Sequence, residues 1–127
     1  MRSRSARRSE DGRARRGRGR RAEVLALLAL MVRGYRPVAR NLKTPVGEID
    51  LIMRRGQVLA IVEVKTRAEY ADAAEAIGPE QQVRIRRATE WLLASRPDLA
   101  KLTIRFDAVL VLPGRWPRHL AGAYSQA

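Results

Sequence analysis

The stretch GEIDLIMRRGQVLAIVEVKTR, residues 47–67, places three charged residues inside two short apolar segments. Asp50, Glu63 and Lys65 lie among isoleucine, leucine and valine residues, and a polar turn that contains Gly56 separates the two segments. A carboxylate that is buried without a partner costs several kcal/mol. Two such acids beside a lysine therefore need a common partner, and a hard cation held by the acids is the simplest one.

The alternation of side chains predicts an antiparallel hairpin with strands over residues 46–53 and 58–66, joined by the four residues between them. In that register Asp50 lies opposite Ile61 and is a diagonal neighbour of Glu63, at about 7–8 Å. Side chains two residues apart on a strand share a face, and a shift by one residue would separate the acids. One face of the hairpin is expected to carry four charged residues: Glu48, Asp50, Glu63 and Lys65.

These residue types suit metal-assisted hydrolysis of a phosphodiester. Mg²⁺, or Mn²⁺ in its place, takes one or two protein carboxylates together with water and phosphate oxygens, and can activate a bound water. Lys65 could orient or deprotonate that water, or neutralise the phosphate. If the hairpin is an exposed edge, Asp50 and Glu63 are instead an ordinary surface pair, and Lys65 is a salt-bridge partner of Glu63.

The spacing of Asp50 and the run Glu63-Val64-Lys65 resembles the D…ExK signature of the restriction-endonuclease-like nucleases. The wider chain, residues 22–124, resembles the YraN family, a small bacterial family related to archaeal Holliday-junction resolvases. The segments that carry this resemblance are residues 22–23, 34–35, 40–41, 47–52, 62–67, 105–107, His119 and 123–124.

This resemblance implies a restriction-endonuclease-like fold with Asp50 and Glu63 as metal ligands and Lys65 as a catalytic residue. It also implies that Glu23, on the first helix, is a further acid near the site, although Glu23 could simply favour the positive end of its helix. Resolvases of this kind act as dimers, so the resemblance implies a homodimer, and no residue pattern identifies its interface.

Contacts to nucleic acid are expected from residues that surround the acids in the sequence. Thr66 and Arg67 follow the catalytic strand and could position a phosphate there. Members of the family usually carry a lysine near the start of the second long helix, where this chain has Gln81 or Gln82. Three arginines within the next turns could replace that lysine and form a stripe facing DNA: Arg84, Arg86 and Arg87.

The composition indicates a polyanionic partner and excludes several kinds of site. The chain of 127 residues has a formal net charge of +13, no cysteine and one histidine. A disulfide framework, a thiolate zinc site and a histidine-rich metal site are therefore excluded. Nucleic acid is the expected partner, because clustered arginines gain affinity by releasing counterions from phosphates, and DNA is expected before RNA. An anionic membrane surface is the weaker alternative.

The charge is concentrated in residues 1–21, which carry ten arginines against two acids. This segment has almost no apolar residues, so we expect a disordered arm that grips phosphates, or a solvated extension without that role. Residues 22–127 are expected to form one domain, the restriction-endonuclease-like one that the resemblance implies. The apolar run at residues 24–32 imitates a signal peptide, but the acidic Glu23 lies between the arginines and the apolar run. Nine apolar residues also cannot span a membrane, which needs about 20. A cytoplasmic protein without a membrane segment is expected.

The remaining elements predict a mixed β-sheet flanked by helices, in the order αβββαβ. Besides the hairpin we expect a helix over residues 21–33, strands over residues 36–43 and 102–112, a second helix from Pro79 to Ser95, and a closing segment that is irregular or a small helix. Asp107 is expected to be a structural partner of Arg105 or Arg67. His119 has no acidic or nucleophilic residue near it in the sequence, so no catalytic role is assigned to it.

Two hypotheses follow for the function. The first is a Mg²⁺-dependent nuclease-like protein that hydrolyses phosphodiester bonds, in branched or damaged DNA. The second is a module on the same fold that binds DNA or RNA and cuts poorly or only with a partner. A structural or assembly factor on RNA or ribosomes is a third interpretation of the same charge.

Overall fold

The computed structural model describes residues 19–67 and 77–124. The predicted order of helices and strands is confirmed within these ranges, with a short helix and a short strand added after the second long helix. The elements are an N-terminal helix whose described part covers residues 19–32, then β1 (Arg36–Thr44), β2 (Gly47–Arg55), β3 (Val58–Thr66), α3 (Pro79–Ser95), α4 (Pro97–Ala100), β4 (Thr103–Val111) and β5 (Arg118–Leu120).

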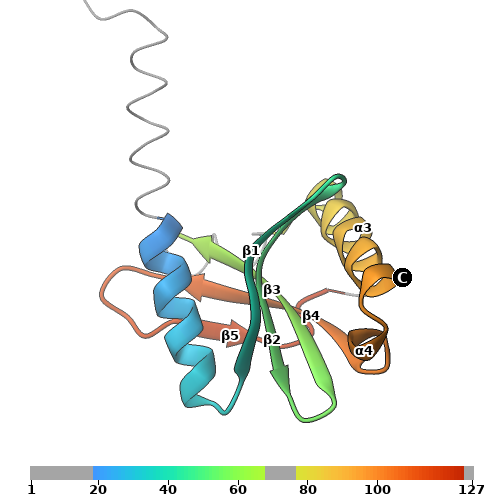
Figure 1. Ribbon diagram of the computed structural model, residues 1–127. Helices are drawn as coiled ribbons and strands as arrows, with labels where there is room; N and C mark the ends of the chain where they lie inside the picture. The colour runs from blue at the N-terminus through green and yellow to red at the C-terminus, as the bar shows by residue number, and fades with distance from the viewer. Residues whose placement is uncertain (1–18, 68–76, 125–127) are drawn as a thin grey trace, which may run out of the picture.

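The strands form one mixed sheet in the order β1-β2-β3-β4-β5 (Figure 1). Strands β3 and β4 are parallel, and the other three neighbouring pairs are antiparallel. A parallel pair needs a long crossover connection, and α3 with α4 lies in that connection.

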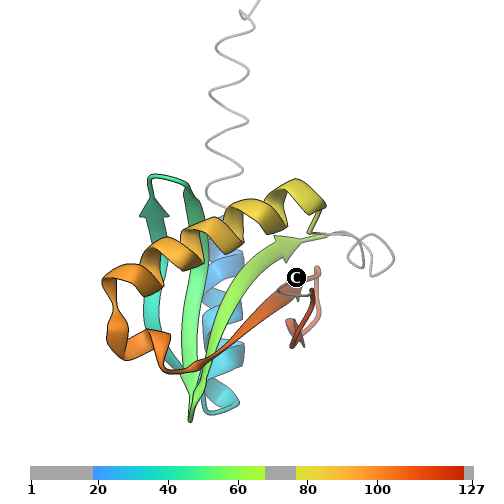
Figure 2. The same ribbon diagram turned by 90° about the vertical axis from the view of Figure 1, so that its right-hand side faces the viewer.

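The N-terminal helix and α3 cover opposite faces of the sheet (Figures 1 and 2). Strand β3 contributes to both sides: Ala60 and Val62 pack in the cluster under the N-terminal helix, whereas Leu59 and Ile61 pack in the cluster under α3. This explains why the segment is continuously apolar, as expected of a strand that is buried on both faces.

The N-terminal helix meets the sheet through Ala22, Ala26 and Leu30, spaced by one helical turn, all of which are buried. It begins earlier than predicted, since residue 19 is already helical, and ends one residue before the predicted limit. Gly34, with φ of 91°, donates its N–H to the Met31 carbonyl and closes the helix in the left-handed conformation that glycine adopts freely.

The predicted arm is only partly within the described residues. Residues 1–18 lie outside them, and residues 19–21 belong to the N-terminal helix. Most of the segment between β3 and α3, residues 68–76, also lies outside the described ranges. Among the residues that are described, no helix is both long and apolar enough to cross a membrane.

The hairpin has a different register from the predicted one. Arg55 pairs with Val58, so the loop has two residues, Gly56 and Gln57, where four were predicted. Gly56 has φ of 60°, which a two-residue hairpin turn requires and which glycine supplies without strain. Because the loop is shorter by an even number of residues, every side chain keeps its predicted face.

Candidate active site

The site forms where β2 and β3 separate. The ladder between these strands ends at the pair Leu51 and Val62, one residue short of Asp50. Beyond that point the Val64 N–H donates to Oδ2 of Asp50 at 2.9 Å, so a carboxylate replaces the missing backbone carbonyl. The local break in pairing therefore holds Asp50 in a defined orientation at the end of the ladder.

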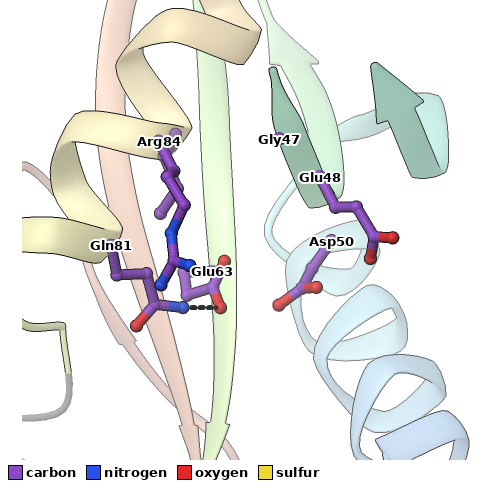
Figure 3. A pocket seen from close by; sticks show the side chains of 7 residues that line it. Gly47, Glu48, Asp50, Glu63, Gln81 and Arg84 are labelled. Carbon is purple, nitrogen blue, oxygen red and sulfur yellow. Dashed lines mark hydrogen bonds between the residues drawn. The ribbon is translucent and has the colours of Figure 1, made fainter. Parts of the chain in front are cut away.

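Glu63 is held by two donors and is only 7% exposed. Gln81 of α3 donates its Nε2 to Oε1 of Glu63 at 2.6 Å (Figure 3). The Nζ of Lys65 lies 3.5 Å from the same oxygen. Lys65 comes from the next position on the same face of β3. The salt bridge between Lys65 and Glu63, which the alternative interpretation of Lys65 expected, is present, and Gln81 is a contact that the sequence did not reveal.

A pocket of about 320 Å³ opens between the ends of β2 and β3 and the first turns of α3. Figure 3 shows Asp50 directed toward Glu63 and Glu48 directed away from it. Gly47 permits the close approach of α3, because a Cβ there would lie 2.9 Å from the Arg84 carbonyl oxygen. The lining residues are Gly47, Glu48, Asp50, Glu63, Gln81, Arg84 and Ile85.

The two carboxyl groups are energetically coupled. Burial and the negative charge of Asp50 raise the pKa of Glu63 to about 8, and Lys65 only partly opposes this. Burial also raises the pKa of Asp50, although the Val64 N–H and the hydrogen bond with Glu63 act in the opposite direction. Without a cation the pair therefore retains a proton near neutral pH, since two buried carboxylates side by side do not both ionise.

Glu23 reaches the same region from the N-terminal helix. Burial raises its pKa, and the negative charge of Asp50 raises it further, while a hydrogen bond from Asn41 and the charge of Arg40 lower it. Asn41 lies on β1 in the left-handed conformation, with φ of 49°, across from Asp50, because its neighbours Arg40 and Leu42 pair with Leu51 and Ile49 of β2. The structure thus brings Glu23 within electrostatic range of Asp50.

The donor set fits a hard divalent cation held with water. The described residues contain no group of three or more acids and histidines that is close enough to enclose a metal ion. Asp50 and Glu63 offer two carboxylates beside an open pocket, and this is the number that Mg²⁺ commonly takes when water and a substrate phosphate complete its shell. Their mutual repulsion is the property that a cation between them would relieve.

The predicted nucleic-acid contacts do not all lie at this pocket. Arg84 lines it, and Arg87 is exposed on the same helix. Thr66 instead lines a groove with Trp116 on the other side of β3, and Arg67 donates to the Thr66 carbonyl at 2.7 Å. Arg86 is half-buried on α3 and is not among the lining residues.

Asp107 forms a structural network on the opposite face of the sheet from Glu63. It is fully buried and accepts two hydrogen bonds from Arg105, both at 2.8 Å, as predicted. The prediction that His119 has no acidic companion is wrong, because its Nε2 lies 2.7 Å from Oδ2 of Asp107. Burial alone would raise the pKa of Asp107, but these contacts and the Gly122 N–H hold it below its usual value.

This network depends on the closing segment, which forms strand β5 and was not predicted to pair with the sheet. His119 lies on β5 and pairs with Val109 of β4, which brings its ring to Asp107. His119 follows Asp107 by twelve positions in the chain. Only the β4–β5 pairing makes them neighbours, and no local pattern indicates it.

Comparison with known proteins identifies the family. The model of the uncharacterised protein family UPF0102 matches residues 22–111. The chain belongs to this family. This confirms the resemblance to the YraN family on which the expectations above depend.

Close relatives within UPF0102 cover nearly the whole chain. A UPF0102 protein of Parvibaculum lavamentivorans is 59% identical over 106 residues, which are 84% of this chain and 80% of the relative. One from Methylorubrum extorquens is 54% identical over 112 residues, 88% of each chain. A third, from Caulobacter vibrioides, is 50% identical over 120 residues, which are 94% of this chain and 96% of the relative.

Proposed function

We propose that this UPF0102 protein is a Mg²⁺- or Mn²⁺-dependent nuclease of the restriction-endonuclease-like fold, acting on phosphodiester bonds of branched or damaged DNA. The observation that carries the proposal is the pairing of Asp50 and Glu63 in one pocket beside Lys65. Their burial makes the doubly ionised pair unfavourable without a cation, and the pocket leaves room for water and a phosphate.

Asp50 and Glu63 would hold the cation, which supplies a water of lowered pKa and offsets charge on the phosphate. Asp50 is oriented for this by the Val64 N–H, and Glu63 by Gln81. Two fixed carboxylates avoid the cost of reorganising ligands when the substrate arrives.

Lys65 supports the chemistry from the same strand. Its Nζ lies 3.5 Å from Oε1 of Glu63, at the edge of the acid pair, where an ammonium can orient the attacking water or neutralise a phosphate oxygen. Arg84 lines the same pocket and supplies a guanidinium that can bind phosphate. Glu23 adds a further acid on the Asp50 side.

The arrangement of the sheet supports the fold assignment. The acids lie where the central strands β2 and β3 separate, on a mixed sheet with one helix on each face. The charge of +13 supports a nucleic-acid substrate, since phosphates are the polyanions that clustered arginines bind best.

The test is incubation of purified protein with plasmid, single-stranded and four-way-junction DNA, with Mg²⁺, with Mn²⁺ and with a chelator. We expect metal-dependent cleavage that is lost in Glu63→Gln and in Lys65→Ala. Lys101→Ala, which removes an exposed lysine far along the chain from the pocket, is the matched control and should cut normally. Cleavage that persists equally in the Glu63 and Lys65 variants would show that a contaminant is responsible.

A second candidate is a nucleic-acid-binding module that does not cut. The observation that favours it is that Oε1 of Glu63 already has two partners within the protein, the Nε2 of Gln81 and the Nζ of Lys65. Calorimetry separates the two functions: the nuclease should bind Mn²⁺ in the wild type, whereas the binding module should show steeply salt-dependent affinity for nucleic acid and no heat of metal binding.

A further inference from the structure

The hydroxyl of Tyr124 is an unexplained polar group. Among the described residues it is the only buried side-chain nitrogen or oxygen atom without a hydrogen-bond partner. Buried tyrosine hydroxyls normally find a partner, and leaving a buried hydroxyl unpaired destabilises a folded protein. Such an atom calls for a partner that the described residues do not supply.

The ring of Tyr124 is nevertheless held firmly in place. It stacks on Phe106 with the ring centroids 5.2 Å apart and an interplanar angle of 28°. The neighbouring Ala123 N–H donates to the Phe106 carbonyl at 2.8 Å. The hydroxyl is therefore at a defined position rather than at the end of a freely rotating side chain.

That position is on the side of the sheet that carries Glu63. Phe106 packs in the cluster under α3 and pairs with Ile61, which precedes Glu63 by two residues on the same face of β3. Burial raises the pKa of Tyr124, the charge of Glu63 raises it further, and the charges of Arg86 and Asp107 act on it more weakly and in opposite directions.

We infer that Tyr124 is a positioning residue for Glu63, whose carboxylate receives a hydrogen bond from the Tyr124 hydroxyl, directly or through one water, when Glu63 holds a divalent cation. Gln81 and Lys65 both contact Oε1 of Glu63. An ionised carboxylate accepts about four hydrogen bonds, so it has room for one more donor. The inference rests on the metal site of the proposed function.

Two buried tyrosines allow a matched test. Tyr35 lies under the N-terminal helix, and its hydroxyl accepts a hydrogen bond from Arg105 at 2.5 Å. Tyr35→Phe removes a hydroxyl that has a partner and lies away from Glu63, whereas Tyr124→Phe removes the unpaired one and keeps the stacking on Phe106. The measurements are the Tm of the metal-free protein and its affinity for Mn²⁺ alone by calorimetry.

We expect opposite results from the two variants. Tyr124→Phe should keep or raise the Tm in a chelator and weaken Mn²⁺ binding by about tenfold or more, the usual effect of losing an outer-shell donor. Tyr35→Phe should lower the Tm by a few degrees and leave Mn²⁺ affinity unchanged.

The failures of this inference and of the proposed function are distinguishable. If the wild type binds Mn²⁺ and Tyr124→Phe binds it equally well, the inference is wrong and the metal site stands. If Tyr124→Phe lowers the Tm as much as Tyr35→Phe does, the hydroxyl has a partner in the metal-free protein and the inference is again wrong. A wild type that binds no Mn²⁺ overturns both.

Discussion

Glu63→Gln is expected to stabilise the metal-free protein at alkaline pH, because Glu63 occupies a position that disfavours its ionised form. Its pKa is about 8 in the folded protein, against an ordinary value of 4.5. Between these two values the unfolded chain has released the proton and the folded protein has kept it. Stability therefore falls as the pH rises through this window, by about 1.4 kcal/mol per pH unit.

The full window corresponds to an upper limit of about 5 kcal/mol above pH 8. The ionisation of Glu63 is linked to the charges of Asp50 and Lys65, so only part of this free energy belongs to Glu63 alone. We therefore expect Glu63→Gln to raise the free energy of unfolding by about 2–3 kcal/mol at pH 9. Glutamine keeps an oxygen that can accept from Gln81, and it has no proton to lose. Below pH 4 both forms are neutral, and the two proteins should be nearly equally stable.

The assay is urea unfolding followed by circular dichroism at pH 4, 6 and 9, with a chelator present. Glu90→Gln, which changes an exposed acid of α3, is the control and should alter the free energy of unfolding by less than about 0.5 kcal/mol. Parallel pH profiles for the wild type and Glu63→Gln would refute the claim that burial and Asp50 disfavour the ionised form.

Further measurements test other parts of the structure. Asp107→Asn should cost about 3 kcal/mol of stability at pH 7, because it removes a buried charge from its partners. The folded-state pKa of Asp107 is lowered, so the stabilisation by its carboxylate is lost as the pH falls through that pKa. The difference in stability between the variant and the wild type should therefore shrink below pH 4 in the same urea experiments. Asp50→Ala should cost about 1–3 kcal/mol in urea unfolding by leaving the Val64 N–H unpaired, and an unchanged stability would contradict that contact. Arg84→Ala should weaken DNA binding uniformly across sequences and reduce the slope of log affinity against log salt by about one, measured by fluorescence anisotropy. Removing residues 1–18 should weaken binding of any nucleic acid at low salt and leave Mn²⁺ affinity unchanged in calorimetry; an altered Mn²⁺ affinity would show that the segment acts on the metal site.

Local patterns were enough to locate the candidate site. The alternation of apolar and charged residues around Asp50 and Glu63 placed both acids on one face of a hairpin, and the structure puts them in one pocket. Pro79 and Pro97 bounded the second long helix at its observed limits. These predictions succeed because period, proline geometry and turn residues act over a few neighbouring residues.

Contacts between distant segments could not be obtained in this way. The donation from Gln81 to Glu63, the burial of His119 against Asp107, and the placement of Tyr124 on Phe106 each join residues that are 12 or more positions apart. The sequence places the acidic residues on their strands. The packing of α3 and β5 onto the sheet decides which groups these acids contact and whether they are protonated. Hydrophobic periodicity and secondary-structure propensity predict which face of a strand or helix a side chain lies on. The free energy of a buried charge depends on every group that folding brings beside it.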